Sequence, residues 1–426
     1  MAKVSLIFKT LEFEPMMQKN LLVRIFFLLI ISLPIQSLAQ KSLSNINQAL
    51  RYSRYSRLGL KIIPVQISET QFKVQFIAEK IEENPEYNAY SFSYALLDSY
   101  DIPIEPEDTQ LFGPADLVFD TDRHWVFEKT ITIDEGKEQL MVLFTALDTR
   151  QGDEYYYHID LKSAFVESHP TFGAYYANEV PFDQNYLNSG EALLFKTTQG
   201  PTLHSFFYPR NFDVPYPPME TKPAPVPREL EVVDQGDFLE NVPKQLDQLG
   251  YYFFQQDTAE ASGLLLKTTH EAFPKVKDWD EMVEMVTYIS TRKEHEDLLA
   301  ASDKKKALDE YWLKLTRNPE TAKELIREYF RQVEFANILF TDFKEGWKTD
   351  KGMVYIVMGP PQEVTFSLDR EIWSYQGIGE SSKIRFTFAR VKNILTPHYY
   401  TLNRSRAYQP VWFKNISQWR SGKMAF

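Results

Sequence analysis

The segment from Gly346 to Pro361 limits most strongly how this chain can fold, because it concentrates residues with special backbone geometry. Gly346 follows a long helical pattern and is expected to end that helix as a left-handed cap. Gly352 then relieves a tight turn. The run from Met353 to Met358 is apolar and rich in β-branched residues, which predicts a central strand buried on both faces. Gly359, Pro360 and Pro361 would end that strand, since prolines cannot donate hydrogen bonds to a ladder.

A long amphipathic helix is predicted before this segment. Asn318 provides an N-cap, Pro319 fits the first helical position, and apolar residues recur at steps of four and three over residues 322–340. Two shorter helices precede it, one opening at the capping box of Asp278 and one capped by Ser302. The sequence therefore predicts a three-helix segment that leads into the Gly-rich turn.

Antiparallel strands are predicted after the turn. Residues 363–366, 371–375 and 383–388 alternate between apolar and polar side chains, as strands with one buried face do. Packing of the long helix on this C-terminal antiparallel sheet would make an α+β unit. We assign this domain to residues 228–426, with its core at 300–390.

In the N-terminal half of the chain, apolar and polar residues mostly alternate with a period of two. Short alternating runs are separated by turn signals, which is typical of an antiparallel β-sandwich. An immunoglobulin-like β-sandwich is therefore expected over residues 60–163. The best strand candidates are residues 72–76, 90–94, 125–133, 139–147 and 155–161.

The middle of the chain also has sequence patterns typical of β-strands. Residues 164–208 predict a second, smaller β module, which is short for an independent core. Prolines crowd residues 209–227 and favour extended polyproline geometry, so we interpret this stretch as a linker. A ligand for a proline-recognising domain is the alternative. A hairpin is expected from residues 250–254 and 263–267.

Composition excludes several classes of function. The chain has no cysteine, which excludes disulfides, thiol catalysis, cysteine-ligated metals and a lipid anchor on an N-terminal cysteine. The net charge of −12 argues against nucleic-acid binding, which needs a basic face. Arg404 and Arg406 offer only a small basic patch.

The N-terminus carries the pattern of an export signal. Basic residues precede an apolar run at residues 25–31. Small residues at the usual cleavage positions follow and end at Ala39. The run is too short to span a bilayer, and a short membrane anchor is the alternative. We expect a signal peptide over residues 1–39, with the true start at Met16 or Met17, and a mature protein that is periplasmic or secreted. No transmembrane helix is expected after its removal.

The C-terminal motifs resemble those of the GWxTD domain family of exported bacterial proteins. The resemblance is strongest over residues 300–390. Lys351 stands where the family often has arginine, which keeps the charge. The matching motifs are Tyr311-Trp312, Tyr329-Phe330-Arg331-Gln332-Val333, Ala336-Asn337, Phe340-Thr341, Gly346-Trp347-Lys348-Thr349-Asp350, Lys351-Gly352, Val354-Tyr355-Ile356, Gly359-Pro360-Pro361 and Trp373-Ser374-Tyr375.

This resemblance implies an exported protein with β-domains before the GWxTD unit, and it implies no particular activity. A shorter pattern, Met358-Gly359-Pro360-Pro361 followed by Trp373-Ser374-Tyr375, is similar to the small lipoprotein of the outer-membrane β-barrel assembly machine. Envelope proteins, including outer-membrane assembly components, are therefore the expected partners.

Asp350 is the one carboxylate in the motif with a candidate catalytic role. An acid or base needs a partner, and Glu345, Glu363 or Asp369 could fold near it. The alternative is a structural role, in which Asp350 caps a turn or pairs with a nearby cation. The candidate cations are Arg331, Lys348 and Arg385.

Three aromatic residues are candidates for binding. Trp347, Trp373 and Tyr375, together with Asp350, could form a platform for a glycan or peptide, and core packing is the alternative. No metal or cofactor is expected, since the Glu294–Asp297 cluster fits a solvated helix end better than a metal site. The residues expected to build the motif itself are Gly346, Trp347, Thr349, Asp350, Gly352, Gly359, Pro360 and Pro361.

The sequence thus favours a non-enzymatic, exported cell-envelope protein that acts by protein–protein interaction or scaffolding. β-Sandwich modules commonly present loops and edges to partners, which motivates this expectation. The alternative is an envelope hydrolase or a glycan-binding protein with a site around Trp347 and Asp350.

Overall fold

The computed structural model describes residues 40–209, 211–221, 231–260, 262–377, 383–393 and 395–424. Residues 42–426 form one compact unit. The expected signal peptide over residues 1–39, together with residues 210 and 222–227 of the proline-rich stretch, lies outside the described residues. Among the helices of the described residues, none is long and apolar enough to cross a membrane.

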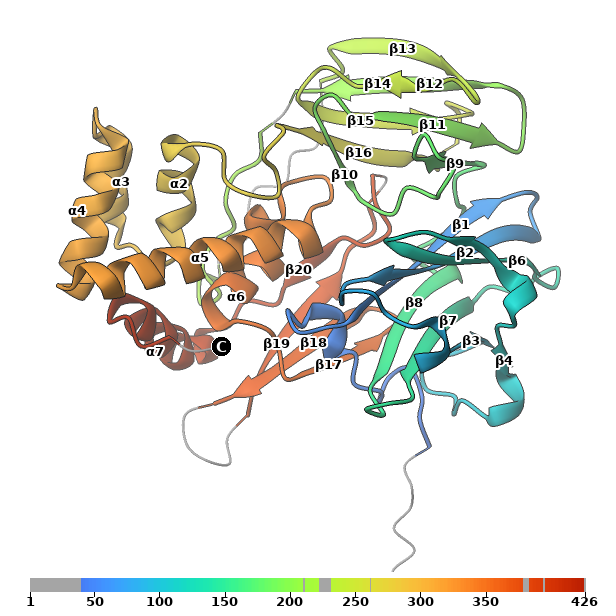
Figure 1. Ribbon diagram of the computed structural model, residues 1–426, viewed down its shortest axis with the longest axis horizontal. Coiled ribbons are helices and arrows are strands. Elements are labelled where there is room, and N and C mark those ends of the chain that lie inside the picture. The colour runs from blue at the N-terminus through green and yellow to red at the C-terminus, as the bar shows by residue number, and fades with distance from the viewer. Residues whose placement is uncertain are drawn as a thin grey trace, which may run out of the picture. The chain divides into compact units, whose positions relative to one another are not determined.

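The expected immunoglobulin-like sandwich is confirmed (Figure 1). Two four-stranded antiparallel sheets, ordered β1-β2-β6-β5 and β4-β3-β7-β8, face each other across an aromatic core of Phe76, Phe127 and Phe144. The alternating pattern of the sequence produces this core, because every second side chain of a strand points inward. The strands are β1 (Leu58–Gln66), β2 (Gln71–Lys80), β3 (Tyr90–Leu97), β4 (Thr109–Leu111), β5 (Leu117–Asp120), β6 (His124–Thr132), β7 (Leu140–Asp148) and β8 (Glu154–Lys162), with short 3-10 turns η2 (Tyr87–Ala89), η3 (Pro106–Asp108) and η4 (Pro114–Asp116) between them.

A second pair of sheets follows. The five-stranded sheet has the order β10-β16-β15-β12-β13, and the three-stranded sheet has the order β14-β11-β9. Strand β12 lies before the proline-rich stretch, whereas its partners β13 and β15 lie after it, so one sheet joins both sides of that stretch. The strands are β9 (Phe172–Tyr175), β10 (Tyr186–Asn188), β11 (Ala192–Thr197), β12 (Thr202–Tyr208), β13 (Asp234–Leu239), β14 (Lys244–Gln245), β15 (Gly250–Gln255) and β16 (Leu264–Thr269).

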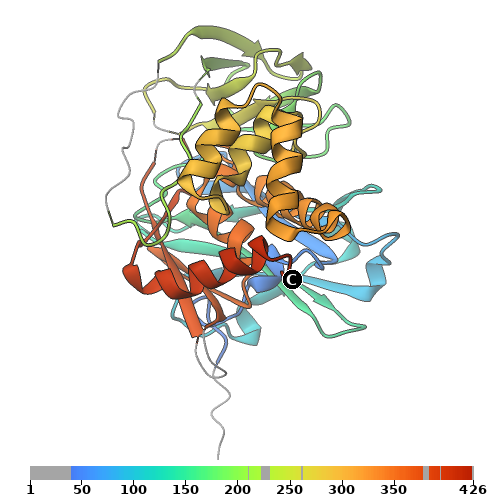
Figure 2. The same cartoon turned by 90° about the vertical axis from the view of Figure 1, so that its left-hand side faces the viewer.

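The predicted long helix is confirmed as α5 (Pro319–Phe340), with the Asn318 side chain accepting from the first turn. The helices before it differ from expectation. The helix opening at Asp278 is divided into α2 (Trp279–Met285) and α3 (Arg292–Ala300), because Thr291 starts a new helix with its own capping box. The next helix, α4 (Lys304–Thr316), is capped by Asp303 and not by Ser302. Figure 2 shows α2–α5 gathered on one side of the fold.

The prediction of a buried strand at Met353–Met358 is wrong, because these residues belong to helix α6 (Asp350–Met358). Every residue from Gly352 to Met358 is buried. A helix that is enclosed on all sides needs no polar face, so its sequence looks like that of a buried strand. Thr349 settles the choice by capping the helix, since its side chain accepts from the Gly352 N–H.

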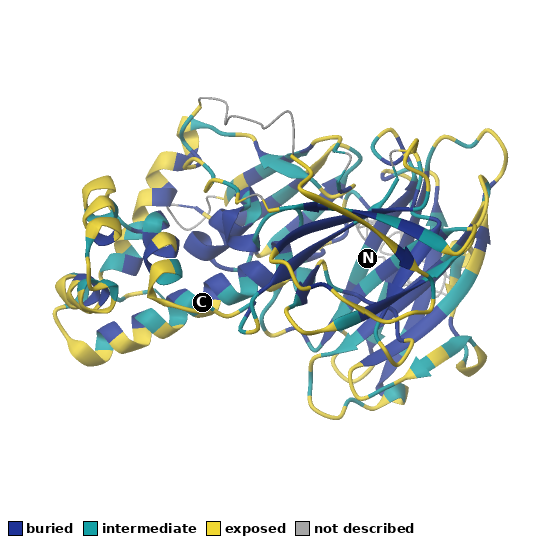
Figure 3. Cartoon of the chain, turned by 90° about the horizontal axis from the view of Figure 1, so that it is seen from above, coloured by how far each residue is buried: buried dark blue, intermediate teal, exposed yellow. Residues whose placement is uncertain are grey.

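The predicted C-terminal antiparallel sheet is confirmed as β17-β18-β19-β20. Helices α5 and α6 share one large core with it, and α7 adds Trp412 and Trp419 to that core. Figure 3 shows the resulting contrast between buried interior elements and exposed outer helix faces. The remaining elements are β17 (Glu363–Ser367), β18 (Arg370–Gln376), β19 (Lys383–Arg390), β20 (Tyr400–Leu402), α7 (Gln409–Arg420), η5 (Val286–Tyr288), η6 (Gly346–Lys348) and η7 (Arg406–Tyr408).

The residues that precede the sandwich belong to this C-terminal core. They include the short helix η1 (Ala49–Tyr52). The Gln48 N–H donates to the Val364 carbonyl at 2.8 Å, and the Asn47 side chain accepts from the Val364 N–H at 2.9 Å. Leu43, Ile46 and Tyr52 are buried in the same cluster as α5 and α6. The chain therefore crosses from the C-terminal core into the sandwich within a few residues.

Candidate functional site

The two glycines of the motif let the long helix α5 and the shorter η6 and α6 come into close contact. A Cβ on Gly346 would lie 1.9 Å from the Ala336 carbonyl oxygen of α5, and one on Gly352 would lie 1.9 Å from the Gly346 carbonyl oxygen. The expectation that Gly346 caps the long helix in a left-handed conformation is wrong. Helix α5 already ends at Thr341, and Gly346 belongs to η6. Gly346 is needed for close approach and not for helix termination.

Hydrogen bonds from α5 hold the motif in place. The Asn337 side chain accepts from the Trp347 N–H at 3.1 Å, and the Thr341 hydroxyl accepts from the Gly346 N–H at 2.9 Å. The Thr349 hydroxyl donates to the Gly346 carbonyl at 2.7 Å. At the far end of α6, the Tyr375 hydroxyl donates to the Gly359 carbonyl at 2.9 Å. These contacts explain why the motif residues occur together.

Asp350 lies at the first turn of α6 and is bound on both oxygens. Arg404 donates to Oδ1 at 2.6 Å and to Oδ2 at 3.2 Å, and the Leu402 N–H donates to Oδ2 at 2.8 Å. Sequence reasoning missed this partner, because Arg404 follows β20 and stands out in the sequence only as part of a small basic patch. The pair joins α6 to β20, and we call it the Asp350–Arg404 clasp.

The carboxylates expected near Asp350 pair with other cations. Glu345 pairs with Lys267 at 2.9 Å, Glu363 with Lys383 at 2.8 Å, and Asp369 with Arg370 at 2.8 Å. Each of these charges therefore has its own partner.

The three aromatic candidates are buried separately in the core. Trp347 keeps 3%, Trp373 0% and Tyr375 5% of its surface accessible. Trp373 packs between Tyr52 and Phe388, and its indole N–H donates to Glu371 at 2.6 Å. These rings therefore pack and form hydrogen bonds inside the core. They do not form a common exposed platform for a glycan or peptide.

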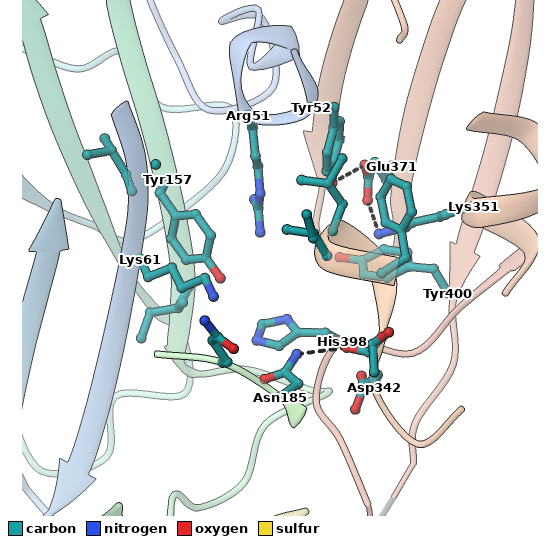
Figure 4. Close-up of a pocket in the computed structure, with 18 of the residues that line it drawn as sticks. Arg51, Tyr52, Lys61, Tyr157, Asn185, Asp342, Lys351, Glu371, His398 and Tyr400 are labelled. Atoms are coloured by element: carbon teal, nitrogen blue, oxygen red, sulfur yellow. Dashed lines mark hydrogen bonds and ion pairs between the residues drawn. The ribbon is translucent and has the colours of Figure 1, made fainter. Parts of the chain in front are cut away.

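A cavity of about 380 Å³ lies where the sandwich, the second β module and the GWxTD motif meet (Figure 4). Strands β1 and β8, helix η1, the end of α5, the start of α6 and the loop before β20 all contribute to its walls. Ile81 and Ile338 line it and are half exposed, which places them at its rim. Of the Gly346–Gly352 segment, Thr349, Asp350 and Lys351 line its wall.

Two buried ion pairs form one side of the cavity. Lys351 pairs with Glu371, which also accepts from the Tyr52 hydroxyl at 2.7 Å and is fully buried. Arg390 pairs with Asp160, and both of these side chains are buried. Since breaking a buried pair leaves an uncompensated charge, these pairs fix the wall geometry.

Arg51 differs from these cations. Its guanidinium carbon lies 3.9 Å from the centre of the Tyr157 ring, and Figure 4 shows it pointing into the cavity. Among the described residues, its guanidinium has no hydrogen bond or ion pair, although Arg51 is partly buried. Stacking on a ring leaves the N–H groups of a guanidinium free, because they point outward in its plane.

The pKa shifts of His398 and Asp342 indicate the electrostatic character of the cavity. Burial lowers the pKa of His398 well below its usual value, and the charges of Arg390, Arg51 and Lys351 lower it further. His398 nevertheless has accessible surface, because it faces the cavity (Figure 4). Burial raises the pKa of the Asp342 carboxyl to about 6. The surroundings of the cavity thus disfavour the protonated, positively charged form of His398. They also disfavour the ionised, negatively charged form of Asp342.

Sequence reasoning missed Arg51 and His398. Arg51 begins a repeated Arg-Tyr-Ser pattern at residues 51–56, which is an unusual alternation of cations and aromatic rings and was available as a signal. His398 had no local signal. Within the described part of the chain, no group of three or more His, Cys, Asp or Glu side chains could hold a metal ion.

The family comparison agrees with the motifs. A family model described as the GWxTD domain matches residues 250–421, which include β15, all the helices from α2 to α7 and the C-terminal sheet. A search of the curated proteins returns no match.

Proposed function

We propose that this chain, whose residues 250–421 match the GWxTD domain, is a non-enzymatic, exported cell-envelope protein that acts by binding other proteins. Envelope proteins, including outer-membrane assembly components, are the proposed partners. The Asp350–Arg404 clasp supports a structural role for the motif, since both oxygens of the carboxylate are engaged within the protein.

The observation that carries the proposal is the outer edge of strand β13, which pairs with no further strand among the described residues. This strand ends the five-stranded sheet, and five apolar side chains on and around it are more than one third exposed. A free strand edge with apolar side chains is a template for an added strand from a partner. We call this surface the β13 edge; its apolar residues are Val232, Val233, Leu239, Val242 and Leu249.

Paired charge substitutions test the β13 edge. Val233→Asp with Leu239→Asp places two charges on exposed positions, so the fold is expected to persist while partner binding is lost. Leu111→Asp with Val118→Asp is the matched control, because these exposed apolar residues lie on the edge strands of the first sandwich. Affinity purification from the producing cell, with the stoichiometry measured, should recover one partner with the wild type and the control only. Recovery of no stoichiometric partner, or its retention by the β13 variant, would contradict the proposal.

Export is the second part of the proposal. It rests on the sequence pattern that ends near Ala39. N-terminal sequencing of the protein from its own cell is expected to begin near Gln40. A chain that retains residues 25–31 would instead support the short membrane anchor.

The alternative function, an envelope hydrolase or a glycan-binding protein, is favoured by one feature. Asp350 lines the cavity, although its oxygens are engaged. A catalytic Asp350 would make Asp350→Asn inactive towards a glycan or peptide substrate while the protein remains folded. Under the structural proposal, the same substitution changes stability first.

A further inference from the structure

We propose that the cavity between the first sandwich and the GWxTD domain is a binding site for a small organic anion, with Arg51 as the residue that holds its carboxylate or phosphate group. This inference is independent of the protein-binding function, because it concerns a different surface and does not involve the β13 edge.

The strongest support is the state of Arg51. Its side chain leaves η1 and enters the cavity, where Tyr157 covers one of its faces at 3.9 Å (Figure 4). Within the described residues, no carboxylate pairs with its guanidinium. Arg51 is partly buried. A partly buried cation without a hydrogen-bonded counter-charge costs stability, and an oxyanion that accepts two N–H bonds from the guanidinium would offset that cost.

The charge balance of the walls points in the same direction. The carboxylates of Glu79, Asp160, Asp350 and Glu371 each pair with an arginine or lysine. Asp342 is the remaining acidic group of the wall, and the Thr396 hydroxyl donates to it at 2.6 Å.

Three wall cations remain without a carboxylate partner in the described part of the chain: Arg51, Lys61 and Lys344. Lys61 donates to the Asp183 carbonyl and points toward the cavity in Figure 4. Three unpaired cations outweigh one carboxyl, so an empty cavity carries an excess of positive charge.

Neutral groups complete the binding surface. His398 and Asn185 face the cavity, and Tyr157 and Tyr400 supply ring surface (Figure 4). The volume of about 380 Å³ lies within the range of about 300–1,000 Å³ typical of small-molecule sites. The occupant is therefore a molecule with one acidic group and a compact apolar or cyclic body, and a long polymer does not fit.

Thermal unfolding of the purified protein tests the inference with simple probes. Phenyl phosphate and benzoate carry the two acidic groups on the same ring, and benzyl alcohol is the neutral control at equal ionic strength. At about tenfold excess over its Kd, an anionic probe should raise Tm by about 1–2 °C. The better of the two anions identifies the acidic group. Equal shifts with the neutral probe, or no saturable shift with either anion, would overturn the inference.

Arg51→Gln removes the positive charge of the guanidinium and the N–H groups that point outward in its plane. It should weaken the binding of the anionic probe by about 10- to 100-fold, as loss of a charge-assisted pair does. Arg292→Gln is the matched control, because its side chain is 92% exposed on α3. Unchanged affinity in the folded Arg51→Gln protein would show that the anion binds elsewhere.

Cysteine protection locates the site even if Arg51→Gln does not fold. The chain has no cysteine, so His398→Cys introduces a single thiol that faces the cavity. The anionic probe should slow its reaction with neutral N-ethylmaleimide, by up to about tenfold when the site is about 90% occupied. Leu249→Cys, exposed on the β13 edge, should react at an unchanged rate. Equal reaction rates of the His398→Cys thiol with and without saturating probe would overturn the inference.

Discussion

At the scale of single residues, the GWxTD motif is explained by close packing and by one ion pair. Gly346 and Gly352 allow the backbones of α5, η6 and α6 to touch, and Asp350 ties α6 to Arg404. Thr349 caps α6 between them. The motif residues therefore make the contacts by which α5, η6 and α6 meet. Each of these residues makes a different contact, so each replacement is expected to affect stability in a different way.

Gly346→Ala is expected to destabilise the protein by more than about 3 kcal/mol, since the new methyl group would overlap the Ala336 carbonyl oxygen. Gly113→Ala is the control, because its Cβ would meet nothing closer than 3.9 Å and its φ of −93° suits any residue. Urea unfolding measures both. Equal midpoints for the two variants would show that the close approach does not exist.

The clasp is best tested by a double-mutant cycle. Asp350→Asn alone leaves Arg404 without its counter-charge and should cost about 3–5 kcal/mol, because both side chains are about 90% buried. Adding Arg404→Gln removes the stranded charge and should recover part of the loss, with a coupling of about 1–3 kcal/mol. Strictly additive losses in urea unfolding would mean that the two groups do not interact.

Asp342 gives a pH-dependent prediction. Its pKa of about 6 exceeds that of an unfolded carboxyl, near 3.8, so the folded protein binds this proton more tightly. The stabilising effect is full below about pH 4 and is lost as the pH rises through 6. Asp342→Asn should therefore gain about 2–3 kcal/mol over the wild type between pH 4 and pH 7. A stability difference that is constant over this range would contradict the prediction.

At the scale of elements, α6 shows what the sequence can and cannot predict. The caps of α2 and α5 and the alternation of β17–β19 follow from local patterns, and these elements form where expected. The apolar run of α6 has no polar face, so its period could not distinguish a buried helix from a buried strand. The partner of Asp350 was unpredictable for another reason, since Arg404 lies 54 residues away and meets it only through tertiary packing.

Thr349→Ala tests the start of α6. Its hydroxyl accepts from the Gly352 N–H at 2.9 Å, and removal of such a cap costs about 1–2 kcal/mol. Thr349→Ser keeps the hydroxyl and should cost much less. Hydrogen exchange at Gly352 should accelerate in the alanine variant only. The same exchange rate in both variants would mean that Thr349 does not cap the helix.

At the scale of the whole molecule, the family match covers only part of a continuous structure. Tyr52 donates to Glu371 and its carbonyl accepts from Tyr355, so residues before the sandwich complete the core of the matched domain. Strand β15 also pairs with β12, which lies outside the match. The matched residues therefore depend on segments from earlier in the chain.

A fragment of residues 250–421 is consequently expected to lack a cooperative unfolding transition, whereas the full chain should have one. The fragment loses Leu43, Ile46 and Tyr52 from its core and leaves β15 without β12. Calorimetry and limited proteolysis compare the two. A fragment that unfolds cooperatively at the Tm of the full chain would show that the early residues are dispensable.

The GWxTD motif is thus a structural support, and the adjacent cavity is proposed as a binding site. A crystal structure of the purified protein with phenyl phosphate tests both statements at once. It should show the phosphate accepting from the Arg51 guanidinium inside the cavity, with the Asp350–Arg404 clasp intact. An empty cavity with the probe bound elsewhere, or an Asp350 released from Arg404 and directed at the probe, would contradict the account.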